Sequence, residues 1–260
     1  MPEAHYKLGK QRPQIDRRTL QFGAYLTKSL AAPPASIDYT KPVKEWPMMG
    51  NDNFGDCTCA AAGHMIEEWT ANTGQVNILS DPVILKAYNH FAHGKADAGA
   101  NMLSVLKYWR KDGIGGDKIL AFAQLEPQND VQLRDAVSIF GSAYLGLALP
   151  DFAVPPGADF LSIPWLVPGK GPVGDAAPNP NNGHCVPAVG YDQRFIYVVT
   201  WGAIKTMSWQ FYDAYADEGF AVLSPDWINK KVGTSPSGFD MAALEQDLAA
   251  VGQGQAAAAD

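Results

Sequence analysis

The order of hydrophobic patterns limits the fold of this 260-residue chain more than any other feature. Helical spacing predominates up to about residue 140, and Val-rich or aromatic runs typical of strands follow from about residue 142. Helical patterns followed by strand patterns predict an α+β fold. The expected helices span residues 56–72, 81–91, 102–111 and 130–140, and the expected strands span 142–149, 184–191, 195–201, 204–208 and 219–223.

These patterns predict four parts of the chain. Residues 1–35 form an N-terminal arm with a short helix at 19–30, and residues 36–140 form a mainly helical subdomain. Residues 141–232 form a β-rich subdomain, and residues 233–260 form a helix followed by a flexible tail. A 28.0 kDa chain with 47% hydrophobic residues has enough apolar material for a sizeable core.

A cysteine stands where a loop gives way to an Ala-rich helical run, in Asn51-Asp52-Asn53-Phe54-Gly55-Asp56-Cys57. Asp56 is a good helix N-cap, which places Cys57 in the first turn. Free N–H groups and the helix dipole favour a thiolate at that position, and a thiolate attacks carbonyl carbons. The alternative is that Cys57 is simply a small buried hydrophobic residue.

A histidine opens a second informative run, Gly183-His184-Cys185-Val186-Pro187-Ala188-Val189-Gly190-Tyr191. The run is rich in Val and follows an Asn/Pro/Gly loop, so it indicates a buried strand. A histidine at the start of a rigid strand is well placed to act as a general base.

A cysteine followed by a histidine about 130 residues later is typical of papain-like cysteine peptidases. The sequence resembles that family in the same order from about residue 33 to about residue 228. The strand 184–191 resembles the family phrase His-Ala-Val-x-x-Val-Gly-Tyr, and Gly55-Asp56-Cys57 resembles Gly-Ser-Cys. Further similar segments are 33–39, 100–114, 132–137, 141–148 and 218–223.

The resemblance implies a papain-like α+β fold with a cleft between two halves. A helical half would carry the cysteine helix, and a strand-rich, antiparallel, barrel-like half would carry the histidine. It implies that Cys57 attacks a peptide or amide carbonyl, that His184 serves as acid and base, and that a thioester forms. Asn51 stands where the family has a glutamine that donates to the oxyanion, although its side chain is one methylene shorter. Gly183, Asn53 and Trp201 are expected to line the substrate cleft.

The residue that orients the histidine is less clear from the sequence. The family uses an asparagine in the phrase Asn-Ser-Trp-Gly, and this chain has Val198-Val199-Thr200-Trp201-Gly202. Counting from Tyr191 places Thr200 on the asparagine position, whereas alignment on Trp201 places Val199 there. Thr200 can accept a hydrogen bond from the ring and valine cannot, so Thr200 is the hypothesised orienting residue.

Two further functions remain open from the sequence alone. The same Cys57–His184 pair would serve an acyl or amide transferase, in which an amine rather than water accepts the thioester. The missing asparagine and the shorter oxyanion donor also leave a catalytically inactive papain-fold binding protein as an alternative.

Other classes of site are not favoured. The three cysteines, Cys57, Cys59 and Cys185, imply no disulfide framework, and the N-terminus lacks the apolar core of a secretory signal, so a cytoplasmic location is expected. The net charge of −7 has no basic stripe, so nucleic acid is not an expected partner, and no apolar run is long enough to span a membrane. We expect no cofactor and no metal, because His90, His93 and Asp97 lack a fourth ligand and His64 lies too far along its helix from Cys57. Oligomeric state and substrate identity do not follow from the sequence.

Two segments are expected beside the cleft. Eight prolines between residues 150 and 180 predict an irregular wall that leads into His184. The arm 1–35 is too short for the family's helical propeptide, yet it is long enough to reach across one subdomain. A narrower hypothesis is therefore that this arm occupies the cleft.

Overall fold

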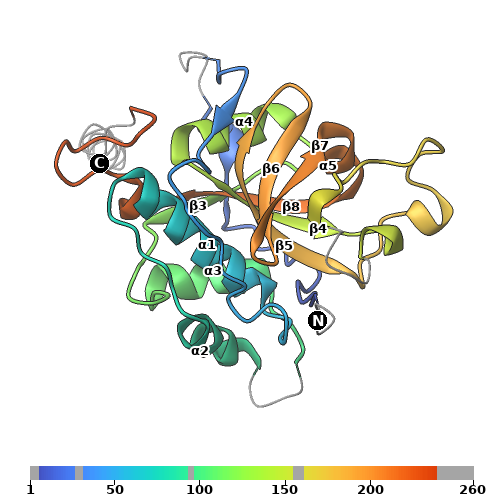
Figure 1. Cartoon of the computed structure of the whole chain (residues 1–260), viewed down its shortest axis with the longest axis horizontal. Helices are drawn as coiled ribbons and strands as arrows, with labels where there is room; N and C mark the ends of the chain where they lie inside the picture. The colour runs from blue at the N-terminus through green and yellow to red at the C-terminus, as the bar shows by residue number, and fades with distance from the viewer. Residues whose placement is uncertain (1–5, 27–31, 93–96, 155–160, 239–260) are drawn as a thin grey trace, which may run out of the picture.

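A computed structural model describes residues 6–26, 32–92, 97–154 and 161–238 of the chain. Helices α1, α2 and α3 gather on one side and a mixed sheet lies on the other (Figure 1). The helices are α1 (Cys57–Asn72), α2 (Asp81–Ala92), α3 (Met102–Lys111), α4 (Asp130–Phe140) and α5 (Trp209–Tyr215). The strands are β1 (Leu20–Gln21), β2 (Ile37–Asp38), β3 (Ala121–Gln124), β4 (Ala143–Ala148), β5 (Gly183–Tyr191), β6 (Phe195–Thr200), β7 (Ala203–Ser208) and β8 (Ala216–Leu223). This confirms the predicted α+β class.

The sheet has the strand order β1-β3-β8-β4-β5-β6-β7, with β2 paired to β5 beside this path. The pairs from β3 to β7 are antiparallel, and only the short β1 pairs in parallel with β3. The central strands β4 and β5 are buried along their whole lengths. Buried central strands explain why their sequences are almost continuously apolar.

Helix α1 is buried on all sides, because its residues from Cys57 to Ala71 are all buried. It packs against β5 on one side and against α2 and α3 on the other. The small residues of its first turns permit this close packing, and the larger Trp69 near its end stacks on Trp109 with ring centroids 5.6 Å apart. A cysteine at the start of α1 therefore lies inside the protein, at the junction of the helical half and the sheet.

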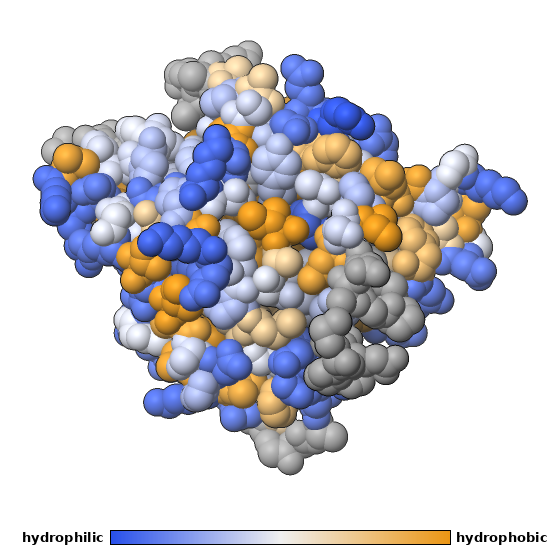
Figure 2. All heavy atoms as spheres, in the orientation of Figure 1, coloured by the Kyte–Doolittle hydropathy of each residue, from blue (hydrophilic) through white to orange (hydrophobic). Residues whose placement is uncertain are grey.

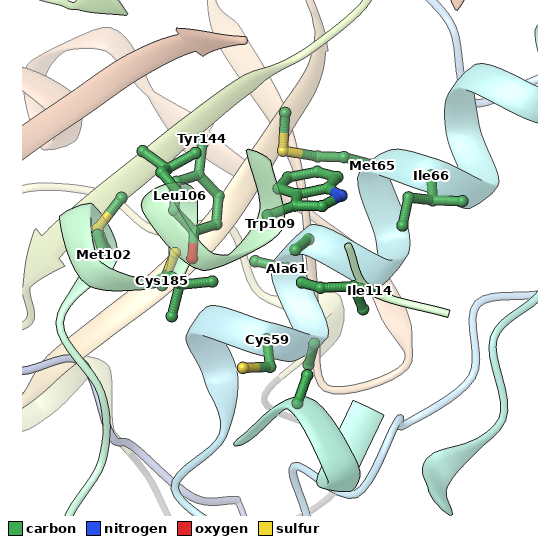
Figure 3. Packing of buried hydrophobic residues seen from close by; sticks show 14 of the residues in the cluster. Cys59, Ala61, Met65, Ile66, Met102, Leu106, Trp109, Ile114, Tyr144 and Cys185 are labelled. Carbon is green, nitrogen blue, oxygen red and sulfur yellow. The ribbon is translucent and has the colours of Figure 1, made fainter. Parts of the chain in front are cut away.

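The helical half has its own hydrophobic core, which reaches the sheet at Tyr144 and Cys185 (Figure 3). The hydroxyl of Tyr144 donates to the carbonyl of Thr58 at 2.7 Å, which ties β4 to the first turn of α1. A second core lies on the other side of the sheet. On the face shown in Figure 2, apolar residues occur in small groups separated by polar ones.

Two sequence-based expectations differ from the structure, and a third is not tested by it. The helix expected at 19–30 is replaced in its described part by β1 and a single 3-10 turn, Phe22–Ala24, because Leu20 and Gln21 pair with β3. The short helix α5 and strand β3 are present where no element was expected. The expected C-terminal helix falls almost entirely on residues 239–260, outside the described residues.

Candidate active site

Cys57 is the first residue of α1, directly after the turn that ends in Asp56. The main-chain carbonyl of Asp56 accepts from Cys59 and Ala60 at 2.7 and 3.0 Å. Its carboxylate makes no capping hydrogen bond, so that part of the expected N-cap is wrong. The physical reason is that Asp56 has φ −97° and ψ 15°, outside the extended conformation that aims an N-cap side chain at the helix.

His184 is the second residue of β5 and is 1% exposed. Its Nε2 atom lies 2.6 Å from Oγ1 of Thr200, the last residue of β6. Among the described residues, Nδ1 has no hydrogen-bond partner. Thr200, rather than Val199, therefore contacts the ring, and a bond at Nε2 leaves Nδ1 as the nitrogen that can exchange a proton.

Trp201 covers the other side of the histidine. Its ring stacks on His184 with centroids 4.3 Å apart and an interplanar angle of 16°. Trp201 and Gly202 form the two-residue turn between β6 and β7, both with positive φ, 47° and 72°. Such a turn matches the twist of a hairpin, but positive φ is unusual for a bulky residue. The strained backbone at Trp201 holds its ring over the imidazole.

The structure brings Cys57 beside the strand that carries His184, because α1 packs on β5. The thiol is close enough to the main-chain N–H groups of Cys185 and Gly9 for both to lower its pKa. No hydrogen bond joins the thiol to Nδ1 of His184 within the described part of the chain. Cys57 and His184 thus lie on two elements that pack together, α1 and β5. A further segment of main chain lies beside the Cys57 sulfur.

That neighbouring chain is residues 6–12, which we call the arm strand. The N–H groups of Gly9 and Lys10 both donate to the carbonyl of Gly183, at 3.2 and 3.0 Å. On the opposite side, Ala100 N donates to Gly9 O at 2.8 Å and Gln11 N donates to Ala100 O at 3.0 Å. Lys10 is bridged in parallel to Ala100 by these bonds. The arm strand is therefore held between the segment before α3 and the start of β5.

The arm strand also contacts residues close to Cys57 and residues close to His184. Lys7 N donates to the carbonyl of Asn51 at 3.0 Å, and Nε1 of Trp201 donates to the carbonyl of Lys7 at 3.0 Å. The Tyr6 ring lies 5.0 Å from that of Trp201. A Cβ atom at Gly9 would collide with the main-chain carbonyl of Gly55, so only glycine permits this approach. The arm strand covers the site, and Cys57 is 1% exposed.

Burial sets the protonation state of the pair. It raises the pKa of the Cys57 thiol to about 12, and the helix-end position does not overcome this. Burial, together with the smaller effect of the nearby Lys10 charge, lowers the pKa of His184 to about 3. The expectation of a thiolate at Cys57 is therefore wrong for the covered conformation, in which both groups are neutral near pH 7.

The remaining predicted cleft residues differ in burial and in their contacts. Asn51 is buried, and one hydrogen of its Nδ2 goes to the carbonyl of Phe54 at 3.0 Å. The Gly183 carbonyl binds the arm strand, whereas Asn53 is exposed in the turn before α1. The roles of Asn51 in binding an oxyanion and of Thr200 in orienting His184 remain predictions.

The other candidate histidines make contacts that are typical of structural residues. Nε2 of His64 lies 2.8 Å from the carbonyl of Pro47, as expected for a hydrogen-bonded core residue. His90 packs on Tyr108 with ring centroids 4.7 Å apart, and His93 lies outside the described residues. Cys57, Cys59 and Cys185 are free thiols. Within the described ranges, no cluster of three His, Cys, Asp or Glu residues is arranged to hold a metal, and no helix is long and apolar enough to cross a bilayer.

Sequence reasoning missed the residues of the arm strand that enter the site, chiefly Gly9 and Lys10, and the acidic residue that Lys10 meets, Glu218. The hypothesis that residues 1–35 occupy the cleft named the segment without naming these residues. A lone glycine beside a lysine in a polar terminal segment is the only local signal, and such a pair is equally typical of an exposed loop.

Comparison of the structure with solved structures shows which fold this is. The cysteine protease xylellain from Xylella fastidiosa is similar with a TM-score of 0.64 and 17% identity, over 86% of this chain and 98% of that one. The fold is that of the papain-like cysteine proteases. A papain-like fold is also found in digestive procathepsin L2 from Tenebrio molitor, which is similar with a TM-score of 0.59 and 14% identity over 84% of this chain and 78% of that one.

A third similar structure contains the cysteine protease and lectin-like domains of Cwp84, from Clostridium difficile. It matches with a TM-score of 0.58 and 14% identity, over 85% of this chain and 57% of that one. No protein-family model matches the sequence, and a search among curated proteins finds no match. At such low identity, the similarity establishes the papain-like fold and does not establish an activity.

Proposed function

We propose that this chain is a cysteine-nucleophile hydrolase that cleaves a peptide or amide bond through Cys57 and His184. The observation that carries the proposal is the ring of His184, which is bonded at Nε2 to Thr200, stacked on Trp201, and left without a hydrogen bond at Nδ1 among the described residues. A fixed imidazole with one vacant nitrogen beside the helix that bears a cysteine suits general acid–base chemistry.

The reaction begins when the Cys57 thiol gives its proton to Nδ1 of His184. The sulfur attacks the carbonyl carbon, a C–S bond forms, and the carbonyl π electrons move to oxygen. As the oxyanion collapses, the C–N bond breaks and the imidazolium donates its proton to the leaving amine. Water then adds to the thioester with His184 as base, the C–S bond breaks, and the thiol and a carboxylic acid result. In the transferase variant, an amine replaces that water.

The oxyanion would be bound by two donors at the start of α1. The Cys57 N–H is at the first helical position, where no intrahelical acceptor exists. Asn51 Nδ2 donates one hydrogen to Phe54, and its side chain is also close enough to the Asp56 carboxyl to lower the pKa of that group, so its second hydrogen would have to turn from Asp56 to the oxyanion. Preorganised donors of this kind stabilise the tetrahedral intermediate by several kcal/mol, about 3–4 kcal/mol per donor.

The covered conformation is, in this proposal, a resting form. Both reactive groups are buried and uncharged, and the arm strand contacts Asn51, Gly183 and Trp201 where a substrate would lie. An extended substrate would replace these main-chain hydrogen bonds after the arm strand leaves. The free thiols fit a reducing compartment, so the cytoplasm remains the proposed location.

A non-catalytic binding protein is the second candidate. It is favoured by one observation, the absence of a thiol–imidazole hydrogen bond among the described residues. In that case the arm strand would be a permanent part of the fold, and its removal would not produce a reactive thiol.

The test compares the alkylation of three thiols in the full-length Gly9→Ala variant, whose new Cβ displaces the arm strand from Gly55. Mass spectrometry would follow iodoacetamide labelling of Cys57, Cys59 and Cys185 at mildly acidic pH. Hydrolysis by the proposed dyad requires Cys57 to label at least about tenfold faster than the other two thiols, and His184→Ala to abolish the difference. Equal, slow labelling of all three would favour the binding protein.

A further inference from the structure

The side chain of Lys10 is inserted into the protein beside the proposed dyad. Its Nζ lies 2.9 Å from Oδ2 of Asp217 and 3.3 Å from Oε1 of Glu218, both on β8. The Lys10 side chain is 1% exposed, as is that of Glu218, whereas Asp217 is 26% exposed. Lys10 therefore forms a buried ion pair that joins the arm strand to β8.

The Lys10 side chain fills a pocket that has a glycine on one wall and carboxyl groups at its end. Gly146 of β4 forms this wall, because a Cβ there would lie 2.8 Å from Cε of Lys10 and 2.7 Å from Cγ of Glu218. Sδ of Met102, at the start of α3, lies at 2.8 Å from the same point and forms an apolar wall. The pocket thus has room for an unbranched aliphatic chain that ends in a positive charge.

An empty pocket would leave the Glu218 carboxyl buried without its cation. Burial raises the pKa of Glu218 to about 7 even with Lys10 beside it, so without a cation this carboxyl takes up a proton near neutral pH, and above that pH its buried charge is unpaired. A substrate side chain that carries a positive charge would restore the ion pair, whereas an apolar side chain of equal length would not. The pocket therefore discriminates by charge once the arm strand leaves.

The main chain of Lys10 connects this pocket to the reactive residues. Gly9 N and Lys10 N both bond to the carbonyl of Gly183, the residue before His184, and the Gly9 N–H is also close enough to the Cys57 thiol to lower its pKa. A residue whose main chain follows this edge can place its side chain in the pocket and a neighbouring carbonyl near the sulfur. The edge and the pocket together can therefore position a peptide.

Given the proposed hydrolase function, we propose that this pocket selects a lysine or another unbranched basic side chain in the substrate. Glu218 is the specificity-determining residue, with Asp217 as a weaker, more exposed contributor. Lys10 occupies the pocket in the resting form and mimics the substrate residue.

The experiment uses the full-length Gly9→Ala/Lys10→Gln variant, in which the arm strand is displaced and its basic side chain is removed. Dipeptidyl epoxide probes would carry lysine, norleucine or glutamate at either of their two positions. Norleucine matches the lysine chain without its charge. Alkylation of Cys57 would be followed by mass spectrometry, and each rate would be divided by the iodoacetamide rate to correct for cleft opening.

We expect the lysine probe to react at least about tenfold faster than the norleucine probe at one of the two positions, and the glutamate probe to be slowest. Glu218→Gln should bring the lysine-to-norleucine ratio close to one. Asp217→Asn, a milder change at a part-exposed residue, should reduce the ratio only partly. The exposed Asp175→Asn is the matched control and should leave the ratio unchanged.

Two outcomes separate this proposal from the one on which it rests. If Cys57 reacts with the probes but lysine and norleucine react equally, the pocket proposal is overturned and the hydrolase proposal remains. If no probe or iodoacetamide modifies Cys57 preferentially, the hydrolase proposal fails and the pocket proposal fails with it. Should Glu218→Gln not fold, the ranking of the three probes on the parent variant and the Asp217→Asn result still decide the matter.

Discussion

Oγ1 of Thr200 lies 2.6 Å from Nε2 of His184, across the pair of strands β5 and β6. This contact occupies Nε2 of the ring and leaves Nδ1 as the nitrogen that can accept a proton from a thiol. Counted from Tyr191, Thr200 stands at the position where the papain-like resemblance implies an asparagine side chain. The hydroxyl supplies one oxygen that can accept the ring N–H, and this is sufficient to select a tautomer.

Thr200→Val should lower the turnover of the arm-displaced enzyme because it removes this acceptor without changing the shape of the side chain. A hydrogen bond to a charged group contributes about 1.5–3 kcal/mol, so a fall of about 10- to 100-fold in kcat is expected for the imidazolium-dependent step. Thr200→Ser keeps the hydroxyl and should retain most of the activity. A Val variant as active as the parent, with equal thermal stability, would show that Thr200 does not orient His184.

Gly9→Ala should increase the rate at which iodoacetamide modifies Cys57 in the full-length chain. The new Cβ would collide with the Gly55 carbonyl, and the arm strand must move away from the thiol. We expect an increase of at least about tenfold at neutral pH. Gly23→Ala is the control, because its Cβ would meet only the flexible end of Gln132. Unchanged labelling in both variants would mean that the arm strand does not limit access.

The pH profile of the same reaction should differ between the covered and displaced forms. In the wild-type chain, burial raises the Cys57 pKa to about 12, so between about pH 6 and pH 9 the rate should rise about tenfold per pH unit. The His184 pKa of about 3 means that no imidazolium is present in this range to hold a thiolate. Gly9→Ala should instead show a nearly flat profile, because an exposed dyad forms the ion pair. A flat wild-type profile would contradict the covered state in solution.

Asp56 should make the free energy of unfolding fall as the pH rises from about 4 to about 8. Burial raises its pKa to about 8, above the unfolded value of about 3.9, so its contribution is fully present below the unfolded pKa and is lost as the pH rises through the folded pKa. Asp56→Asn should therefore lose less free energy of unfolding between about pH 6.5 and pH 8.5, as measured by urea denaturation.

This pH window avoids the buried histidines. The pKa values of His64 and His184 are lowered to about 4 and about 3, so they affect stability only as the pH falls below their unfolded value of about 6.5. The exposed Asp175→Asn serves as the control and should follow the wild type. An Asp56→Asn variant with the wild-type slope would mean that Asp56 does not carry this dependence.

The sequence was a good guide to elements whose limits are set by local chemistry. Helices α3 and α4 begin at the expected residues because Asn101 and Asn129 cap them and accept from Ser104 N and Gln132 N. The run 184–191 was correctly expected to be a strand because its apolar residues are buried throughout. The short helix α5 was not predicted because it is too short for its aromatic residues to show a helical period.

Contacts between distant segments were much harder to foresee. No local pattern shows that Gly9 meets Gly55, or that Lys10 reaches Glu218 across 208 residues of sequence. The pKa of Cys57 also depends on contacts between distant segments. A helix end favours a thiolate in water, but the arm strand and β5 remove that water, and desolvation then outweighs the helix dipole.

The arm strand belongs to the same polypeptide as the thiol that it covers, and this has a kinetic consequence. A tethered segment is present at an effective concentration on the order of millimolar, however dilute the protein is. Dilution does not uncover Cys57, and a free peptide must outcompete a neighbour that never diffuses away. Cutting the chain after the arm strand, in contrast, would turn a unimolecular equilibrium into a bimolecular one and make the cover dissociate at low protein concentration.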